Sequence, residues 1–302
     1  MKANLAFMFS NWYSGATLLA ILLNNHSQLV CNGETFPFQY DESNSDIYVC
    51  SCGKHMRLCD FYTQTTKSLK TDKGNWNNDF RIMPNISRIP TISKIVCSFN
   101  KHVWLRDLML RTGLPLRKRL DNYLKAHQQF YKRAREYYGA DCYIDGTKSI
   151  RRAELFLKYD NNTIKGIYLI RDGRGFCWSY LKNKKLSNDK LPEAAKSWNE
   201  YVEIMDIFMK RYSDVEILTV RYEDLCNEPK DTLCRICLLL GVNYEERMIG
   251  NPMNHHLLGN RMRSNFDGNI IEDLSWKKKF SRSEIKYLNE AMSVYLKEYG
   301  YL

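Results

Sequence analysis

The sequence lacks any uninterrupted apolar run long enough to span a bilayer, which argues against a transmembrane protein. Its first residues resemble a signal peptide only faintly, because the polar turn at residues 10–15 interrupts the apolar run and no small-residue cleavage site follows. We therefore expect a soluble, cytoplasmic protein without a membrane partner. Its ten cysteines would then be mostly reduced thiols.

Two further absences concern phosphate and nucleic-acid motifs. No G-x-x-x-x-G-K-[ST] sequence occurs, which disfavours a kinase that uses ATP through that loop. No RNA- or DNA-binding motif is present, so we expect no nucleic-acid partner. The formal net charge of +11 nevertheless favours anionic ligands, such as nucleotides and sulfated or phosphorylated molecules.

Predicted strands alternate with predicted helices, which indicates an α/β fold with a central, mostly parallel sheet flanked by helices. The apolar runs at residues 5–9, 29–30, 142–144, 164–170 and 215–220 are the expected strands. Helices are expected at residues 17–23, within 97–138, and at 150–159, 192–212, 229–241 and 283–299. The polar segment 39–80 contains several cysteines and is predicted to be a surface insertion. No internal repeat is visible, and the length allows one domain or two, of which we expect a single domain over residues 1–302.

Residues 3–19 combine a buried strand, a turn containing Gly15 and an apolar helix. This layout points backbone N–H groups and a helix N-terminus at an anion, with hydroxyls available from Ser14 and Thr17. By itself the signal is weak, because many α/β domains open with a strand and a helix.

Three other polar motifs also follow predicted strands: D-G-T-K-S at 145–149, R-D-G-R-G-F-C-W-S at 171–179 and R-Y-E-D-L at 221–225. In parallel sheets, ligands bind beyond the carboxyl ends of the strands. Because all four motifs follow strands, they predict one ligand site at that edge of the sheet.

In this order, the four motifs resemble those of the sulfotransferases that use 3′-phosphoadenosine 5′-phosphosulfate (PAPS), over nearly the whole chain. The bacterial-type members and the carbohydrate and protein-tyrosine branches are the most similar. The resemblance implies a P-loop-like sulfotransferase fold and an enzyme that moves a sulfuryl group from PAPS to an acceptor, giving adenosine 3′,5′-bisphosphate. The cofactor-binding residues that it implies are Tyr13, Ser14, Gly15, Ala16, Thr17, Leu18, Arg171, Ser179, Tyr222, Arg261, Met262 and Arg263.

Within these motifs, Arg171 offers a fork of donors for a dianionic phosphate, and Ser179 lies about two helical turns further on. Arg174 is interpreted either as a further ligand or as a structural ion-pair partner. For Tyr222, contact with adenine and a place in the core are both open. Arg261 and Arg263 belong to G-N-R-M-R, which resembles a late basic loop of the family, although a solvated loop is an alternative.

Sulfuryl transfer requires a base for the nucleophile and a cation for the leaving oxygen. We predict that Glu34 is the base, because the resemblance places a catalytic carboxylate at this position; a loop-capping role is the alternative. Most relatives have Arg or Lys where this chain has Tyr13, and a tyrosine is neutral at pH 7. We therefore expect Lys148 to supply the missing cation. Ala16 also departs from the usual Ser or Thr.

Three histidines remain as alternatives for the base. His26 lies near a predicted helix end, which favours a structural role, whereas His255 and His256 stay open. No metal is needed for the predicted mechanism. Cys50, Cys52, His55 and Cys59 allow a zinc site, but their C-x-C spacing is unusual, so reduced thiols in a loop are favoured and no metal is predicted.

The acceptor is not encoded in any recognisable motif. A hydroxyl of a small natural product or sugar is expected, with an amine or guanidine nitrogen as a less favoured nucleophile. Trp76 and Trp104 could either line the acceptor pocket or fill a core. The alternative function is a catalytically degenerate nucleotide-binding protein, suggested by Tyr13 and Ala16. Oligomeric state cannot be inferred from these residues.

Overall fold

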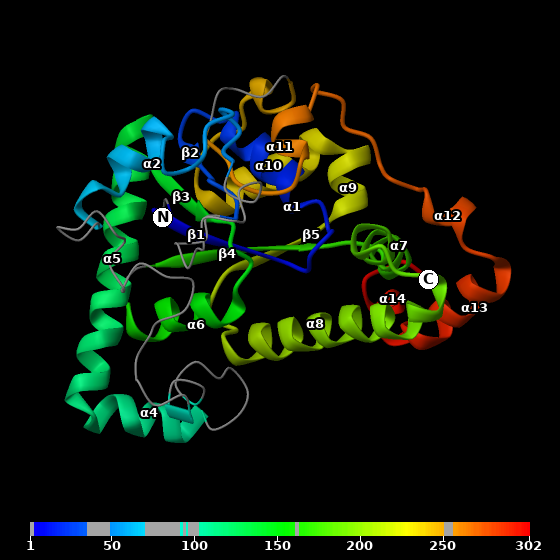
Figure 1. The fold of residues 1–302 in the computed structure, drawn as a ribbon, viewed down its shortest axis with the longest axis horizontal. Coiled ribbons are helices and arrows are strands. Elements are labelled where there is room, and N and C mark those ends of the chain that lie inside the picture. Colours follow the sequence, from blue (N-terminus) through cyan, green and yellow to red (C-terminus); the bar gives the residue numbers. More distant parts are fainter. Residues whose placement is uncertain are drawn as a thin grey trace.

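The computed structural model describes residues 3–34, 49–69, 103–160, 163–250 and 256–302, together with residues 91, 92 and 95. In this part of the chain, one five-stranded sheet has the order β2-β3-β1-β4-β5, and every strand pair in it is parallel. The strands are β1 (Leu5–Ser10), β2 (Leu29–Val30), β3 (Cys142–Asp145), β4 (Ile164–Ile170) and β5 (Ile217–Arg221). The predicted α/β class with a parallel sheet is therefore confirmed (Figure 1).

The helices are α1 (Ala16–Asn24), α2 (Asp60–Thr65), α4 (Val103–Thr112), α5 (Leu114–Tyr138), α6 (Ile150–Tyr159), α7 (Gly173–Lys184), α8 (Leu191–Arg211), α9 (Tyr222–Asn227), α10 (Pro229–Leu240), α11 (Met262–Asn265), α12 (Trp276–Lys279), α13 (Arg282–Ala291) and α14 (Ser293–Glu298). The prediction of a single helix over 283–299 is wrong, since α13 and α14 are separated at Met292.

The predicted start of the last strand is also wrong, since β5 begins at Ile217, two residues later than expected. Half of the predicted insertion at 39–80, namely residues 39–48 and 70–80, lies outside the described residues, as do residues 97–102.

Alternating side chains of the sheet belong to two separate hydrophobic cores. Along β1, Phe7 and Phe9 pack in the core that includes α5, α6, α7 and α8. Ala6 and Met8 belong to the other core, with α1 and α10. Figure 1 shows α6 and α8 on one face of the sheet and α1 and α10 on the other. Because side chains on both faces of the sheet are buried, the sequences of the strands are nearly continuous apolar runs.

Polar side chains of the predicted motifs follow the carboxyl ends of the strands, as expected for a parallel sheet. The loop after β1 leads into α1, the loop after β3 contains Lys148, and the loop after β4 leads directly into α7. Glu34 follows β2 by a few residues. None of the helices in the described ranges is both long and apolar enough to cross a membrane.

Candidate active site

The loop between β1 and α1 has the backbone of an anion-binding turn. Gly15 caps α1 with a left-handed φ of 87° and no side-chain capping bond. A Cβ at this position would lie 2.4 Å from Cδ2 of Tyr222, so only glycine fits. The first turn of α1, which begins with Ala16 and Thr17, contains no acidic residue. The N–H groups at the start of this helix therefore favour a negative charge.

Tyr13 precedes Gly15 with a positive φ of 63°. Its ring centroid lies 6.4 Å from those of Phe176 and Tyr180, and the ring is half-buried. Burial is the main cause that raises the pKa of Tyr13, so this side chain stays neutral and can only donate or accept hydrogen bonds. The loop thus lacks the cation that the family usually places there.

Lys148 belongs to a loop that Asp145 shapes. The backbone N–H and the hydroxyl of Thr147 donate to Oδ1 of Asp145 at 2.9 and 2.5 Å. The hydroxyl of Tyr131 donates to the other carboxylate oxygen at 2.5 Å, and Arg152 pairs with the same oxygen at 3.0 Å. Lys148 follows with a φ of 63°, a conformation that costs energy for a side chain other than glycine. The Asp145 network therefore holds Lys148 in a strained position, which is common at functional sites.

Glu34 and Lys148, which are 114 positions apart in the chain, form an ion pair through Oε1 and Nζ. The Lys148 side chain is 10% exposed and that of Glu34 30% exposed. A small pocket beside the pair is also lined by Ala16 and Thr17 of α1. Residues 11–15, between β1 and α1, are here called the phosphate loop. The structure thus brings the two predicted catalytic side chains together at the N-terminus of the helix that follows this loop.

Residues 256–263, here called the strap, pass beside this pocket and contribute Leu258 to its lining. The N–H of Glu34 donates to the Leu258 carbonyl at 3.0 Å, and the N–H of Leu258 donates to Asn32. Gly33 between them has a φ of 63°, and a Cβ there would lie 2.1 Å from the Leu258 oxygen. Close backbone contact at Gly33 therefore seats Glu34 against the strap.

Arg171 and Ser179 lie on the other side of the phosphate loop. Nη1 of Arg171 donates to Oγ of Ser179 at 3.0 Å and to the Tyr13 carbonyl at 2.9 Å. The guanidinium lies 4.7 Å above the ring of Tyr222. Tyr222 is buried between Gly15 and Arg171, so it supports both the loop and the arginine from behind. Of the two interpretations of Tyr222, this geometry favours a place in the core.

Asp273 was missed by the sequence analysis. Its carbonyl accepts a bond from Nη2 of Arg171 at 3.1 Å, and its carboxylate lies 3.5 Å from the same nitrogen. Nothing in the local sequence distinguishes this aspartate from other loop carboxylates. In this structure Arg171 is therefore engaged by an acidic side chain of the protein itself.

The remaining predicted basic residues have different environments. Arg174 pairs with Asp172 at 2.7 Å and lies 4.6 Å from the ring of Trp276, which favours its structural interpretation. Arg263 donates to the carbonyls of Val49 and Gly259 and so fastens the strap. Arg261 and Met262 are exposed.

Lys184 is a second cation near Tyr13 that the sequence analysis did not single out. It lies on α7, one helical turn after Tyr180, and its Nζ donates to the Tyr180 hydroxyl at 2.7 Å. Its positive charge acts on Tyr13 by lowering that residue's pKa, against the larger effect of burial. The spacing of Tyr180 and Lys184 on one helix face was the signal that could have revealed it.

The alternative bases lie away from the pocket or outside the described residues. His26 is buried, and its Nε2 lies 2.7 Å from the Asn243 carbonyl, in agreement with the structural role expected for it. His256 faces three cysteines. His255 and Trp76 are outside the described residues, whereas Trp104 is 70% exposed on α4.

Comparisons with known proteins identify one family. A profile described as "Sulfotransferase family" matches residues 117–246, which contain Lys148, Arg171, Ser179 and Tyr222. Glu34, the phosphate loop and the strap lie outside this match. Among curated protein sequences, none is significantly similar to this chain.

Similar solved structures cover almost the whole chain. The sulfotransferase domain from the curacin biosynthetic pathway has 16% identity and a TM-score of 0.49, covering 96% of this chain and 98% of that one. The sulfotransferase domain of a Synechococcus olefin synthase has the same identity of 16% and TM-score of 0.49, covering 97% and 95%. A mouse sulfotransferase complexed with PAP has 12% identity and a TM-score of 0.47, covering 100% and 89%.

The family profile includes the arginine and serine that meet beside the phosphate loop, and the parallel sheet carries all four predicted motifs at its carboxyl edge. Over residues 117–246, the chain is therefore similar to the sulfotransferase family, whose members are enzymes that transfer sulfuryl groups.

Proposed function

We propose that this protein transfers the sulfuryl group of PAPS to a hydroxyl group of a small molecule or sugar, with nitrogen nucleophiles as a less favoured class. The observation that carries the proposal is the Glu34–Lys148 pair beside the N-terminus of α1. A carboxylate and an ammonium at the edge of an anion-binding turn are the two groups that sulfuryl transfer requires. The proposed reaction takes place in the cytoplasm.

The residues present suit an anionic nucleotide. The uncapped start of α1 and the left-handed Gly15 would hold the 5′-phosphosulfate, which brings the sulfuryl group to the site. Arg171 and Ser179, with one arginine nitrogen already on the serine hydroxyl, would hold the 3′-phosphate. Arg261 is an exposed cation on the strap and would add positive charge over the nucleotide.

Glu34 would accept the proton of the attacking hydroxyl. Lys148 would stabilise the charge that develops on the leaving phosphate oxygen, a role that a flexible ammonium suits well. An ammonium has three N–H donors, so Lys148 can keep its bond to Glu34 while donating to another oxygen. The pair would therefore orient the base and neutralise the leaving group from one position. Catalysis would rest on positioning and charge, as in phosphoryl transfer.

The test is calorimetric binding of adenosine 3′,5′-bisphosphate, with AMP as the ligand that lacks the 3′-phosphate. We expect wild-type protein to prefer the bisphosphate by about 10- to 100-fold, because charge-assisted bonds to a phosphate contribute about 1.5–3 kcal/mol. Arg171→Ala should abolish this preference. Ser179→Ala should reduce it less, and it serves as a second variant that leaves the buried arginine in place.

Equal affinity for the bisphosphate and AMP in the wild-type protein would refute the proposal. A degenerate nucleotide-binding protein is the second candidate, because a neutral Tyr13 replaces the usual cation. It would bind the bisphosphate tightly but transfer no sulfate to any member of a panel of alcohols, amines and guanidines. The same panel decides between oxygen and nitrogen acceptors.

Asp273 offers an independent prediction about the 3′-phosphate. Its carboxylate lies 3.5 Å from Arg171 and would compete with a bound phosphate for that cation. We expect Asp273→Asn to tighten bisphosphate binding by about 5-fold, in line with the roughly 1 kcal/mol of a partly solvated charge pair, and to leave AMP binding unchanged. Asp267→Asn is the matched control, because Asp267 is in the same loop and, among the described residues, its side chain bonds to Asn269 and not to Arg171. Equal tightening of AMP would show that Asp273 does not act on the 3′-phosphate.

A further inference from the structure

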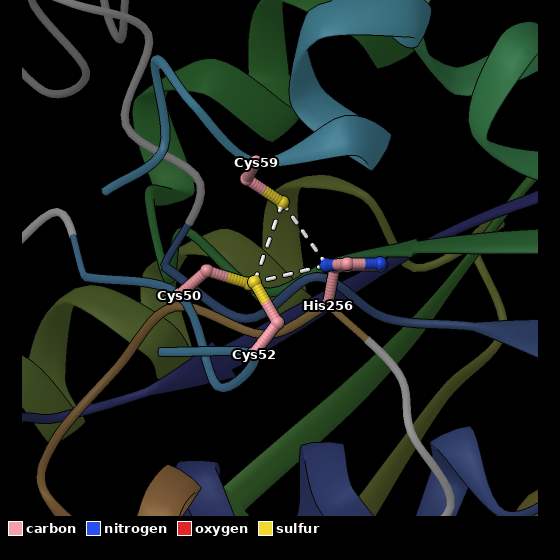
Figure 2. Close-up of side chains that lie close together, drawn as sticks. All are labelled: Cys50, Cys52, Cys59 and His256. Atoms are coloured by element: carbon pink, nitrogen blue, oxygen red, sulfur yellow. Dashed lines mark hydrogen bonds between the residues drawn. The ribbon is translucent and has the colours of Figure 1, made fainter. Parts of the chain in front are cut away.

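Three cysteines and one histidine meet outside the pocket described above. The ligand atoms of Cys50, Cys52, Cys59 and His256 all lie within 4.8 Å of one another (Figure 2). Cys50 and Cys52 belong to the tight turn at 49–55, Cys59 precedes α2, and His256 begins the strap. Residues almost 200 positions apart therefore converge on one point.

Three of the separations within this cluster are close to, or somewhat shorter than, the edges of a zinc tetrahedron. Nδ1 of His256 lies 3.0 Å from Sγ of Cys59 and 3.4 Å from Sγ of Cys50. The sulfurs of Cys52 and Cys59 are 3.7 Å apart. Tetrahedral zinc with Zn–S of about 2.3 Å and Zn–N of about 2.0–2.1 Å separates sulfur from sulfur by about 3.8 Å and sulfur from nitrogen by about 3.6 Å.

Backbone hydrogen bonds fix the positions of Cys50 and Cys52 in a tight turn. Gly53, with a φ of 80°, closes a tight turn in which its N–H donates to the Cys50 carbonyl at 2.8 Å. The Cys50 N–H donates to the Lys54 carbonyl at 2.9 Å, and Val49 pairs with His55 in a short antiparallel bridge. This hairpin presents the two sulfurs on the side where the strap passes.

His256 is oriented by its aromatic neighbours. Its ring stacks on Phe61 at a centroid distance of 5.4 Å, and Tyr137 contacts it edge-on at 6.1 Å. The backbone N–H of His256 donates to the Tyr138 hydroxyl at 2.9 Å. Packing and backbone bonding therefore direct Nδ1 toward the thiols. Cys50 and Cys59 are fully buried, which leaves Cys52 as the exposed member of the group.

We propose that Cys50, Cys52, Cys59 and Nδ1 of His256 bind one structural Zn²⁺ ion. The three thiols each release a proton and form Zn–S bonds, neutral His256 supplies the Zn–N bond, and no oxidant or reductant takes part. Three sulfurs and one imidazole in a tetrahedron select zinc over magnesium or calcium. Because all four positions are filled by the protein, the site is structural and leaves no position for a substrate.

From its position in the sequence, His55 was grouped with the cysteines, and reduced thiols were favoured there. In the structure, Nδ1 of His55 accepts a bond from the Arg57 N–H at 3.2 Å, and the fourth member of the cluster is His256 instead. With His256 as the fourth ligand, the site joins two segments that are far apart in the sequence. A ligand from the strap lets the metal tie residues 50–59 to this segment beside the pocket.

Hydrogen bonds extend this connection to Glu34. The N–H of Ser51 donates to the Leu257 carbonyl at 3.0 Å, and the N–H of Leu257 donates to Oγ of Ser51 at 3.0 Å. The next residue, Leu258, accepts the bond from the Glu34 N–H. The proposed ion therefore stabilises the segment against which the predicted base rests, although its binding does not depend on the proposed reaction.

The test is the zinc content of protein purified under reducing conditions, followed by titration of metal-free protein with Zn²⁺ alone. We expect about one zinc per chain, and Co²⁺ in its place should give the spectrum of a tetrahedral thiolate site. His256→Gln and Cys52→Ser should weaken Zn²⁺ binding by at least about 100-fold, because each removes one of four ligands. Cys52 is exposed, so its serine variant should still fold.

The matched controls are His55→Gln and Cys234→Ser, which make the same changes outside the cluster and should retain one zinc per chain. Zinc removal by a chelator should lower the Tm of the wild-type protein, because a ligand that binds only the folded state stabilises it. Metal-free protein that fails to take up Zn²⁺, or a disulfide detected among these cysteines in protein kept reduced, would overturn the proposal. Equal zinc loss in the controls and the ligand variants would overturn the assignment of these four residues.

Discussion

Replacing Glu34 by glutamine is expected to lower kcat for sulfuryl transfer by about 10²- to 10⁴-fold, the range for loss of a general base. The amide keeps the shape of the side chain and can still accept a bond from Lys148, but it cannot take a proton. Binding of adenosine 3′,5′-bisphosphate should stay unchanged or tighten slightly, since one negative charge near the nucleotide is removed. Steady-state kinetics and calorimetry on the same preparation measure both quantities.

Glu246→Gln is the matched control for this variant. Glu246 also pairs with a lysine, Lys230, but on the exposed surface away from the strand ends. Its replacement should leave kcat and Tm close to the wild-type values, because exposed ion pairs contribute little to stability. A Glu34→Gln enzyme with wild-type kcat would remove Glu34 from the role of base and leave it as a loop carboxylate.

Replacing Lys148 by methionine is expected to lower kcat by about 10²- to 10³-fold, the cost of losing one preorganised donor to a developing anion. Methionine keeps most of the apolar stem and the same backbone conformation, so the change isolates the ammonium. The effect should fall on kcat more than on KM, because the charge that Lys148 stabilises is greatest in the transition state. Lys148→Arg should recover part of the rate by restoring a cation.

The double variant with Glu34→Gln and Lys148→Met tests whether the two residues act as a unit. Because they share an ion pair in one pocket, their effects on kcat should not be additive, and the double variant should lose much less than the product of the single losses. Lys230→Met is the surface control and should keep wild-type kinetics. Full additivity would mean that the two side chains contribute to kcat separately. A Lys148→Met enzyme with wild-type kcat would contradict the role proposed for Lys148, and Lys184 would be the next candidate for the cation.

The sequence by itself determined the class of fold, and it predicted that the polar motifs lie at the ends of the strands. Runs such as 164–170 are apolar on both faces, which a parallel sheet covered by helices requires, and each ends in polar residues. These are local properties, encoded by neighbouring side chains. The spacing of Arg171 and Ser179 was equally local, since one helix carries the serine back toward the arginine.

Only the tertiary structure decided which distant residues meet. Glu34 and Lys148 pair because β2 and β3 are neighbours in the sheet and their following loops pack against each other at Gly33. Asp273 reaches Arg171, and His256 rather than His55 joins the cysteines, because the C-terminal segments fold back over the strand ends. No sequence spacing records such contacts, since they depend on how separate loops close over one sheet edge. The helix break at Met292 was likewise invisible, because the residues on either side keep an amphipathic pattern that continues through it.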